Sequence, residues 1–103
     1  MYMLCFHVPE SHTEIVKNAI FTAGAGQVGH YSHCSWQILG EGQFMPLDGH
    51  QAFLGETDKL EKVAEFKVET VCDTAHIQAV IAALKHAHPY ETPSYQVWKL
   101  ENF

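Results

Sequence analysis

The chain has 103 residues, 47% of them apolar, and twelve acidic residues against six lysines give it a formal net charge of −6. This length and composition exclude a largely disordered chain and predict one domain over residues 1–103 with a single core. The lysines are scattered among acids and no arginine is present, so the chain lacks the basic patches that nucleic-acid binding depends on.

The three cysteines, Cys5, Cys34 and Cys72, cannot all pair within one chain. The sequence also shows no signal-peptide pattern and no apolar run of about 18 residues. We therefore expect a cytoplasmic protein without a membrane partner. Cys5 and Cys72 lie in apolar runs, which is typical of small buried core residues.

The first half of the chain predicts a strand followed by an amphipathic helix. Residues 1–8 are almost continuously apolar, as in an interior strand, and Pro9 ends the run. Residues 11–14 have the form of a capping box, and apolar residues then recur at helical spacing as far as Ala23, before Gly24.

The same order returns in the second half. Residues 65–72 form a β-rich segment, Asp73 or Thr74 is the expected helix cap, an apolar stripe follows over residues 77–84, and residues 95–100 supply a closing strand. Two such units in roughly 100 residues predict an α+β, ferredoxin-like split βαβ domain whose helices cover only one face of the sheet.

Between the two halves, residues 29–55 are rich in glycine and aromatics and predict a long, bent hairpin. No helix remains to cover the second face of the sheet, so we expect another copy of the chain to bury these groups in a homo-oligomer. Strand alternation places His7, Lys67 and Glu69 on that face.

Residues 24–29 match the dinucleotide-binding fingerprint in letters only. That fingerprint needs a strand before it and a helix after it, whereas here it follows a predicted helix. We interpret its glycines as allowing a tight passage from the helix to the next strand.

His30, His33 and Cys34 are residue types that bind transition metals. On a flat strand His30 and Cys34 would lie about 13 Å apart at ~3.3 Å per residue, with His33 on the other face. Only a sharp bend or a second chain would complete a zinc site from these ligands.

A second metal-ligand set is His86, His88 and Glu91. The alternative is that the histidines are solvent-facing residues at a helix end, where a cationic imidazole favours the helix dipole. Pro89 and Pro93 fix an extended backbone around Tyr90 and Glu91. This segment is either a rigid connection or places those two side chains in a site or a subunit contact.

Several motifs together resemble the inserted middle domain of the YqfO (Nif-three-like, NGG-interacting factor) proteins, here as a stand-alone chain. They are Gly24-Ala25-Gly26 through Gly29, Tyr31 and Cys34; Gly40-Glu41-Gly42-Gln43-Phe44 with Pro46, Gly49 and Gly55; and His88-Pro89-Tyr90-Glu91 with Pro93 and Tyr95. The closing part also resembles the CutA proteins.

The resemblance implies a PII-like, CutA-like fold that assembles as trimers. The dinuclear metal site of YqfO-type proteins belongs to the domains that flank this one, so neither that site nor the GTP cyclohydrolase name transfers. CutA-like proteins are linked with divalent-metal tolerance and copper binding.

We therefore expect a non-enzymatic oligomeric binding or regulatory module, favoured as a homotrimer, with no identified catalytic residues. The ligand at subunit interfaces is unknown; a divalent transition metal, zinc or copper, is the leading candidate and a small ligand the other. The metal would draw on His7, His30, His33, Cys34, His86, His88 and Glu91. The alternatives are a small enzyme with a His/Glu acid–base pair at an intersubunit cleft and a purely structural assembly partner.

Overall fold

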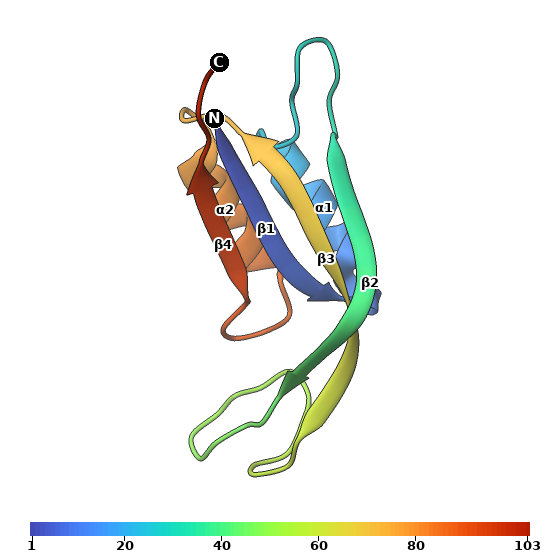
Figure 1. The fold of residues 1–103 in the computed structure, drawn as a ribbon. Helices are drawn as coiled ribbons and strands as arrows, with labels where there is room; N and C mark the ends of the chain where they lie inside the picture. Colours follow the sequence, from blue (N-terminus) through green and yellow to red (C-terminus); the bar gives the residue numbers. More distant parts are fainter.

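A computed structural model describes residues 1–103 and contains one sheet and two α-helices. The elements run β1 (Tyr2–Pro9), a short 3-10 turn η1 (Glu10–His12), α1 (Thr13–Thr22), β2 (Ser35–Phe44), β3 (Glu61–Cys72), α2 (Ile77–Ala87) and β4 (Tyr95–Lys99). The strand order is β2-β3-β1-β4, and every neighbouring pair is antiparallel. Both helices lie on the same face of the sheet (Figure 1). This is the predicted split βαβ arrangement.

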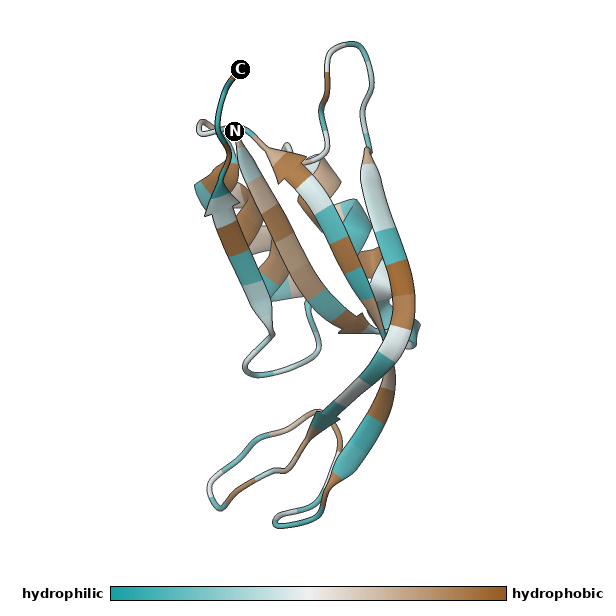
Figure 2. Ribbon diagram, in the orientation of Figure 1, coloured by the Kyte–Doolittle hydropathy of each residue, from teal (hydrophilic) through white to brown (hydrophobic).

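The core lies between the helices and the sheet. Strand alternation turns Leu4, Phe6 and Val8 of β1 toward the helices, and all three are fully buried. Hydrophobic residues also dominate the middle of β1 in Figure 2. The rest of this core comes from α1, β3 and α2: Val16, Ile20, Ala25, Val68, Cys72, Ile77, Val80 and Leu84. Cys5 is buried as well, as predicted.

The predicted capping box at residues 11–14 is wrong. The turn η1 follows Pro9 and delays the start of α1 to Thr13, so that no side chain caps the helix. Ser11 Oγ instead lies 2.8 Å from Nδ1 of His12, and Thr13 Oγ1 donates to the carbonyl of Pro9 at 3.1 Å. The N-cap of α2 is His76 and not Asp73 or Thr74, although Oδ1 of Asp73 accepts the N–H of His76 at 2.9 Å in the turn that leads into α2.

The long hairpin exists, but its second arm is β3 rather than a strand before Gly55. The pairing between β2 and β3 runs from Ser35 opposite Thr70 to Phe44 opposite Glu61. β1 reaches only as far as Pro9 opposite Glu65, so the end of the hairpin extends beyond the sheet and the molecule measures 46 × 24 × 24 Å (Figure 1). Neither helix has the length and apolar character needed to cross a membrane.

Candidate functional site: a pocket beneath the hairpin

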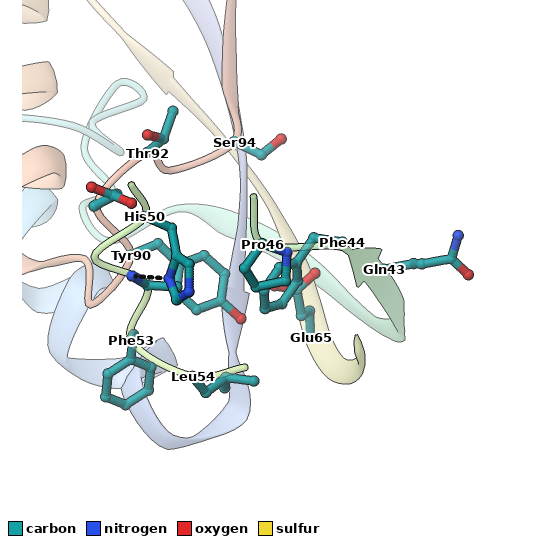
Figure 3. A pocket seen from close by; sticks show the side chains of 12 residues that line it. Gln43, Phe44, Pro46, His50, Phe53, Leu54, Glu65, Tyr90, Thr92 and Ser94 are labelled. Carbon is teal, nitrogen blue, oxygen red and sulfur yellow. Dashed lines mark hydrogen bonds between the residues drawn. The ribbon is translucent and has the colours of Figure 1, made fainter. Parts of the chain in front are cut away.

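A cavity of about 270 Å³ lies where the hairpin tip meets the loop between α2 and β4 (Figure 3). Three segments contribute to it: the end of β2 with the hairpin tip, β3 through Glu65, and the loop after α2. Its lining residues are Gln43, Phe44, Pro46, His50, Ala52, Phe53, Leu54, Glu65, Tyr90, Glu91, Thr92 and Ser94. The structure thus places both Tyr90 and Glu91 in a cavity.

The loop after α2 is fixed by His88. This residue has an extended backbone (φ −70°, ψ 135°), which ends the helix before Pro89. Its buried ring bonds the carbonyl of His7 through Nε2 at 2.7 Å, and its Nδ1 accepts the N–H of Tyr90 at 3.1 Å. These two partners require the neutral tautomer with hydrogen on Nε2. Burial lowers the pKa of His88, which favours this neutral form.

The other end of the loop is bound to the same strand. The N–H of His7 donates to the carbonyl of Ser94 at 3.1 Å, and Nδ1 of His7 lies 3.1 Å from Ser94 Oγ. Residues 88–94 are therefore bound at both ends to the C-terminal end of β1. Tyr90 and Glu91 extend from a loop that is fixed at both ends.

The hairpin tip is held against this loop by polar and aromatic contacts. Oε1 of Glu91 accepts the backbone N–H of Gln51 at 2.8 Å. The ring of Tyr90 lies 6.1 Å from that of Phe44 and 6.3 Å from that of Phe53, centroid to centroid. The tip thus contacts the loop after α2 through one hydrogen bond and two aromatic pairs, and the pocket lies between them.

Tyr90 and Glu65 both line the pocket and lie next to each other. The Tyr90 hydroxyl is buried next to the Glu65 carboxylate, and no group of the protein donates a hydrogen bond to its oxygen. Burial, and then the adjacent Glu65 carboxylate, raise the pKa of Tyr90, so the phenol stays neutral. Gly42 makes room for the carboxylate, because a Cβ at that position would overlap Oε1 of Glu65.

Glu65, Phe44 and Phe53 line the pocket but were not identified as site residues from the sequence. Gly40 and Gly42 of β2 pair with the part of β3 that carries Glu65, and glycines leave space on a sheet surface. This pairing is the signal that could have identified Glu65. That signal depends on the register of the hairpin, which the sequence pattern placed incorrectly.

His30, His33 and Cys34 lie in the loop between α1 and β2, near the end of the sheet opposite the hairpin tip (Figure 1). This loop turns sharply at a Val28–Tyr31 bridge and is not a flat strand. The ring of His33 packs against Phe21 at 5.0 Å between centroids. The preceding glycines make the predicted tight passage, with Gly26 at a φ of +81°.

Of the second predicted set, His86 is exposed and Glu91 lines the pocket. The expectation of a solvent-facing side chain is wrong for His88, which is only 6% exposed and uses both ring nitrogens. In residues 1–103 no group of three His, Cys, Asp or Glu side chains is arranged to hold a metal ion. A metal site from the predicted ligands therefore requires a second copy of the chain and stays a prediction.

The helix-free face of the sheet carries the predicted polar cluster. His7 lies opposite Lys67, and Lys67 Nζ is 3.4 Å from Oε1 of Glu69. His7, Glu65 and Lys67 also line a second hollow of about 260 Å³ on this face. Large apolar side chains surround the cluster and are about half exposed: Trp36 (57%), Ile38 (52%) and Trp98 (51%).

No protein-family model matches the chain. Curated proteins named "GTP cyclohydrolase 1 type 2 homolog" do match. The one from Mycobacterium leprae is 46% identical over 94 residues, which is 91% of this chain and 24% of the relative. The one from Halalkalibacterium halodurans is 40% identical over 102 residues, 99% of this chain and 27% of the relative. The chain spans about a quarter of the length of these relatives.

Two solved structures show the same fold. A Bacillus cereus protein related to NIF3 is 38% identical with a TM-score of 0.83, and the match covers 98% of this chain and 26% of that one. The periplasmic divalent cation tolerance protein CutA from Archaeoglobus fulgidus has a TM-score of 0.69 at 17% identity, covering 100% of this chain and 87% of that one. The second likeness shows the fold alone.

Proposed function

We propose that this chain is a non-enzymatic binding module that works as a self-associated assembly. The premise is that the chain resembles, over nearly all its length, a segment of the NIF3-related proteins and has the fold of CutA, as predicted. The activity named for the curated relatives belongs to proteins of which this chain spans about a quarter. We therefore assign the chain a binding role and not the cyclohydrolase reaction.

The observation that carries the self-association is the uncovered face of the sheet. Trp36, Ile38 and Trp98 are each more than half exposed there, around the ion pair between Lys67 and Glu69. Large apolar side chains that are exposed together on one face are typical of a surface that a protein partner covers. A second copy is the simplest such partner, and three copies around an axis would give the predicted trimer.

The observation that carries the binding role is the pocket beneath the hairpin. The pocket lies between the hairpin tip, which extends beyond the pairing of β3 with β1, and the loop after α2. A ligand in this position would contact both segments and change how firmly the tip is held. A binding module that reports a ligand to a partner through the hairpin is the function that this arrangement supports best. The predicted transition-metal ligands would instead act between subunits.

The second hollow favours an alternative function as a small enzyme. It brings His7 and Glu65 to one surface, which is the His/Glu combination that general acid–base catalysis uses. This alternative requires turnover of some metabolite that His7→Gln abolishes without dissociating the assembly.

Native mass spectrometry tests the assembly, because one spectrum reports both subunit number and bound mass. Two adjacent residues of β2 make a matched pair: Ile38 (52% exposed) faces away from the helices, and Leu39 (51% exposed) faces their side. We expect oligomers for the wild type and Leu39→Glu, and monomers for Ile38→Glu. Zinc or copper added in stoichiometric amount should bind only to the oligomer. A wild-type monomer at micromolar concentration would refute the self-association.

A further inference from the structure

We propose that the pocket beneath the hairpin binds a small organic ammonium ion that carries N–H donors. The inference rests on the proposed binding role, because it names the ligand class of that site. It does not rest on self-association, since every lining residue comes from a single chain.

The charge of the pocket favours a cation. Glu65 and Glu91 both line it, whereas none of the six lysines is among the lining residues. Its other polar lining groups include the hydroxyls of Thr92 and Ser94, which are able to accept hydrogen bonds. A positively charged donor is the ligand that complements two carboxylates in a half-enclosed site.

The apolar walls favour an organic cation. Phe44, Phe53 and Tyr90 present three aromatic rings to one cavity, with both phenylalanine rings about 6 Å from that of Tyr90. Ammonium groups are attracted to aromatic faces within roughly 6 Å of the ring centroid. The alkyl part of the ligand gains from the same walls.

The Tyr90 hydroxyl explains why the ligand should carry N–H groups. Its O–H lies beside the Glu65 carboxylate, but no group of the protein donates a hydrogen bond to the buried oxygen, and a buried polar atom with an unused acceptor position is open to a ligand donor. An ammonium N–H that donates to Oη of Tyr90 would lie beside Glu65, whose carboxylate compensates the charge. A quaternary ammonium ion offers no such donor.

A metal ion fits this pocket poorly. No three His, Cys, Asp or Glu side chains are arranged around a common point in residues 1–103, whereas metal ions in proteins need several close ligands. The volume of about 270 Å³ lies at the lower limit of ligand pockets. It suits a ligand of the size of a short alkylamine.

The test is an NMR titration of the ¹⁵N-labelled full chain with three probes. Butylammonium carries charge and N–H donors, tetramethylammonium carries charge alone, and 1-butanol is a neutral analogue of butylammonium. We expect shifts at residues 43–54 and 90–94, with affinity falling in that order. Equal affinity for 1-butanol and butylammonium, or no saturable shift at these residues, would overturn the proposal.

Three variants locate the interaction. We expect Glu65→Gln to weaken butylammonium roughly tenfold, as for a lost bond to a charged group. Tyr90→Phe should weaken butylammonium but leave tetramethylammonium unchanged. Glu41→Gln is the control, because Glu41 is an exposed residue of the same hairpin outside the pocket. An equal loss in Glu41→Gln and Glu65→Gln would refute the site.

Two further observations keep the result decisive. If Glu65→Gln fails to fold, Gly42→Ala replaces it, since the added Cβ displaces the Glu65 carboxylate without removing its charge from the chain. A monomer that binds butylammonium would refute the assembly and keep this proposal. An oligomer that does not bind butylammonium would support the assembly and refute this proposal.

Discussion

The imidazole of His88 donates from Nε2 to the backbone carbonyl of His7 at 2.7 Å, across 81 positions of sequence. This bond joins the end of α2 to the end of β1, and the Nδ1 of the same ring accepts the N–H of Tyr90. One neutral side chain thus fixes the loop from which Tyr90 and Glu91 reach the pocket. The position of the site depends on a residue that does not line it.

His88→Ala should lower the free energy of unfolding by about 1–3 kcal/mol, because it leaves a carbonyl and an N–H unpaired in a buried place. Urea denaturation at pH 8 measures this loss. His86→Ala is the matched control: His86 is exposed on the same last turn of α2, so its removal should change stability by less than about 0.5 kcal/mol. Equal losses would show that the His88 bonds contribute nothing.

Stability should also depend on pH through His88. Burial lowers the pKa of its folded form below the ordinary value of 6.5, with His12 acting in the same direction, and the His7 carbonyl and Glu65 acting against it. The unfolded state then binds more protons in this range, so the stability contributed by neutral His88 is present above pH 6.5 and is lost as pH falls below it. The difference in unfolding free energy between wild type and His88→Ala, measured from pH 8 to pH 5, should shrink. A constant difference would contradict the burial argument.

The elements with strong local patterns were predictable. β1 appears within one residue of its expected bounds, and α2 contains the whole expected apolar stripe of residues 77–84 and runs on to Ala87, because continuous apolar residues and a helical stripe leave few alternatives. The start of α1 was not predictable. Residues 11–14 match a capping box in letters, but the turn after Pro9 occupies the first two of these positions and the helix begins at Thr13. A cap depends on the backbone entering the helix, which the side-chain pattern does not record.

The pocket was predictable only in part. The prolines indicated that Tyr90 and Glu91 are held in a set conformation, and both line the cavity. Glu65 and Phe53 reach the same place through the register of β2 and β3 and through the folding back of the tip, which are long-range features. Pairing across a long hairpin leaves little trace in local sequence.

Gly42→Ala should move the Glu65 carboxylate without greatly destabilising the protein. The overlap involves the flexible end of a glutamate side chain and not backbone, and Gly42 has no positive φ. We expect a change in unfolding free energy below about 1 kcal/mol, together with changed chemical shifts for Tyr90. Gly40→Ala is the control, because a Cβ there meets open space. Unchanged Tyr90 shifts in Gly42→Ala would contradict the assigned position of Glu65.

Glu91→Ala should loosen the hairpin tip while leaving the sheet intact. The variant removes the acceptor for the N–H of Gln51, a 2.8 Å bond that joins the tip to the loop after α2. Amide hydrogen exchange should become roughly tenfold faster at Gln51 and stay unchanged in β1, whose amides pair with β3 and β4. Thr92→Ala is the neighbouring control, since Thr92 also lines the pocket. If Gln51 exchanges at the wild-type rate in Glu91→Ala, the tip is held by its aromatic contacts alone, and the carboxylate serves the pocket only as a charge.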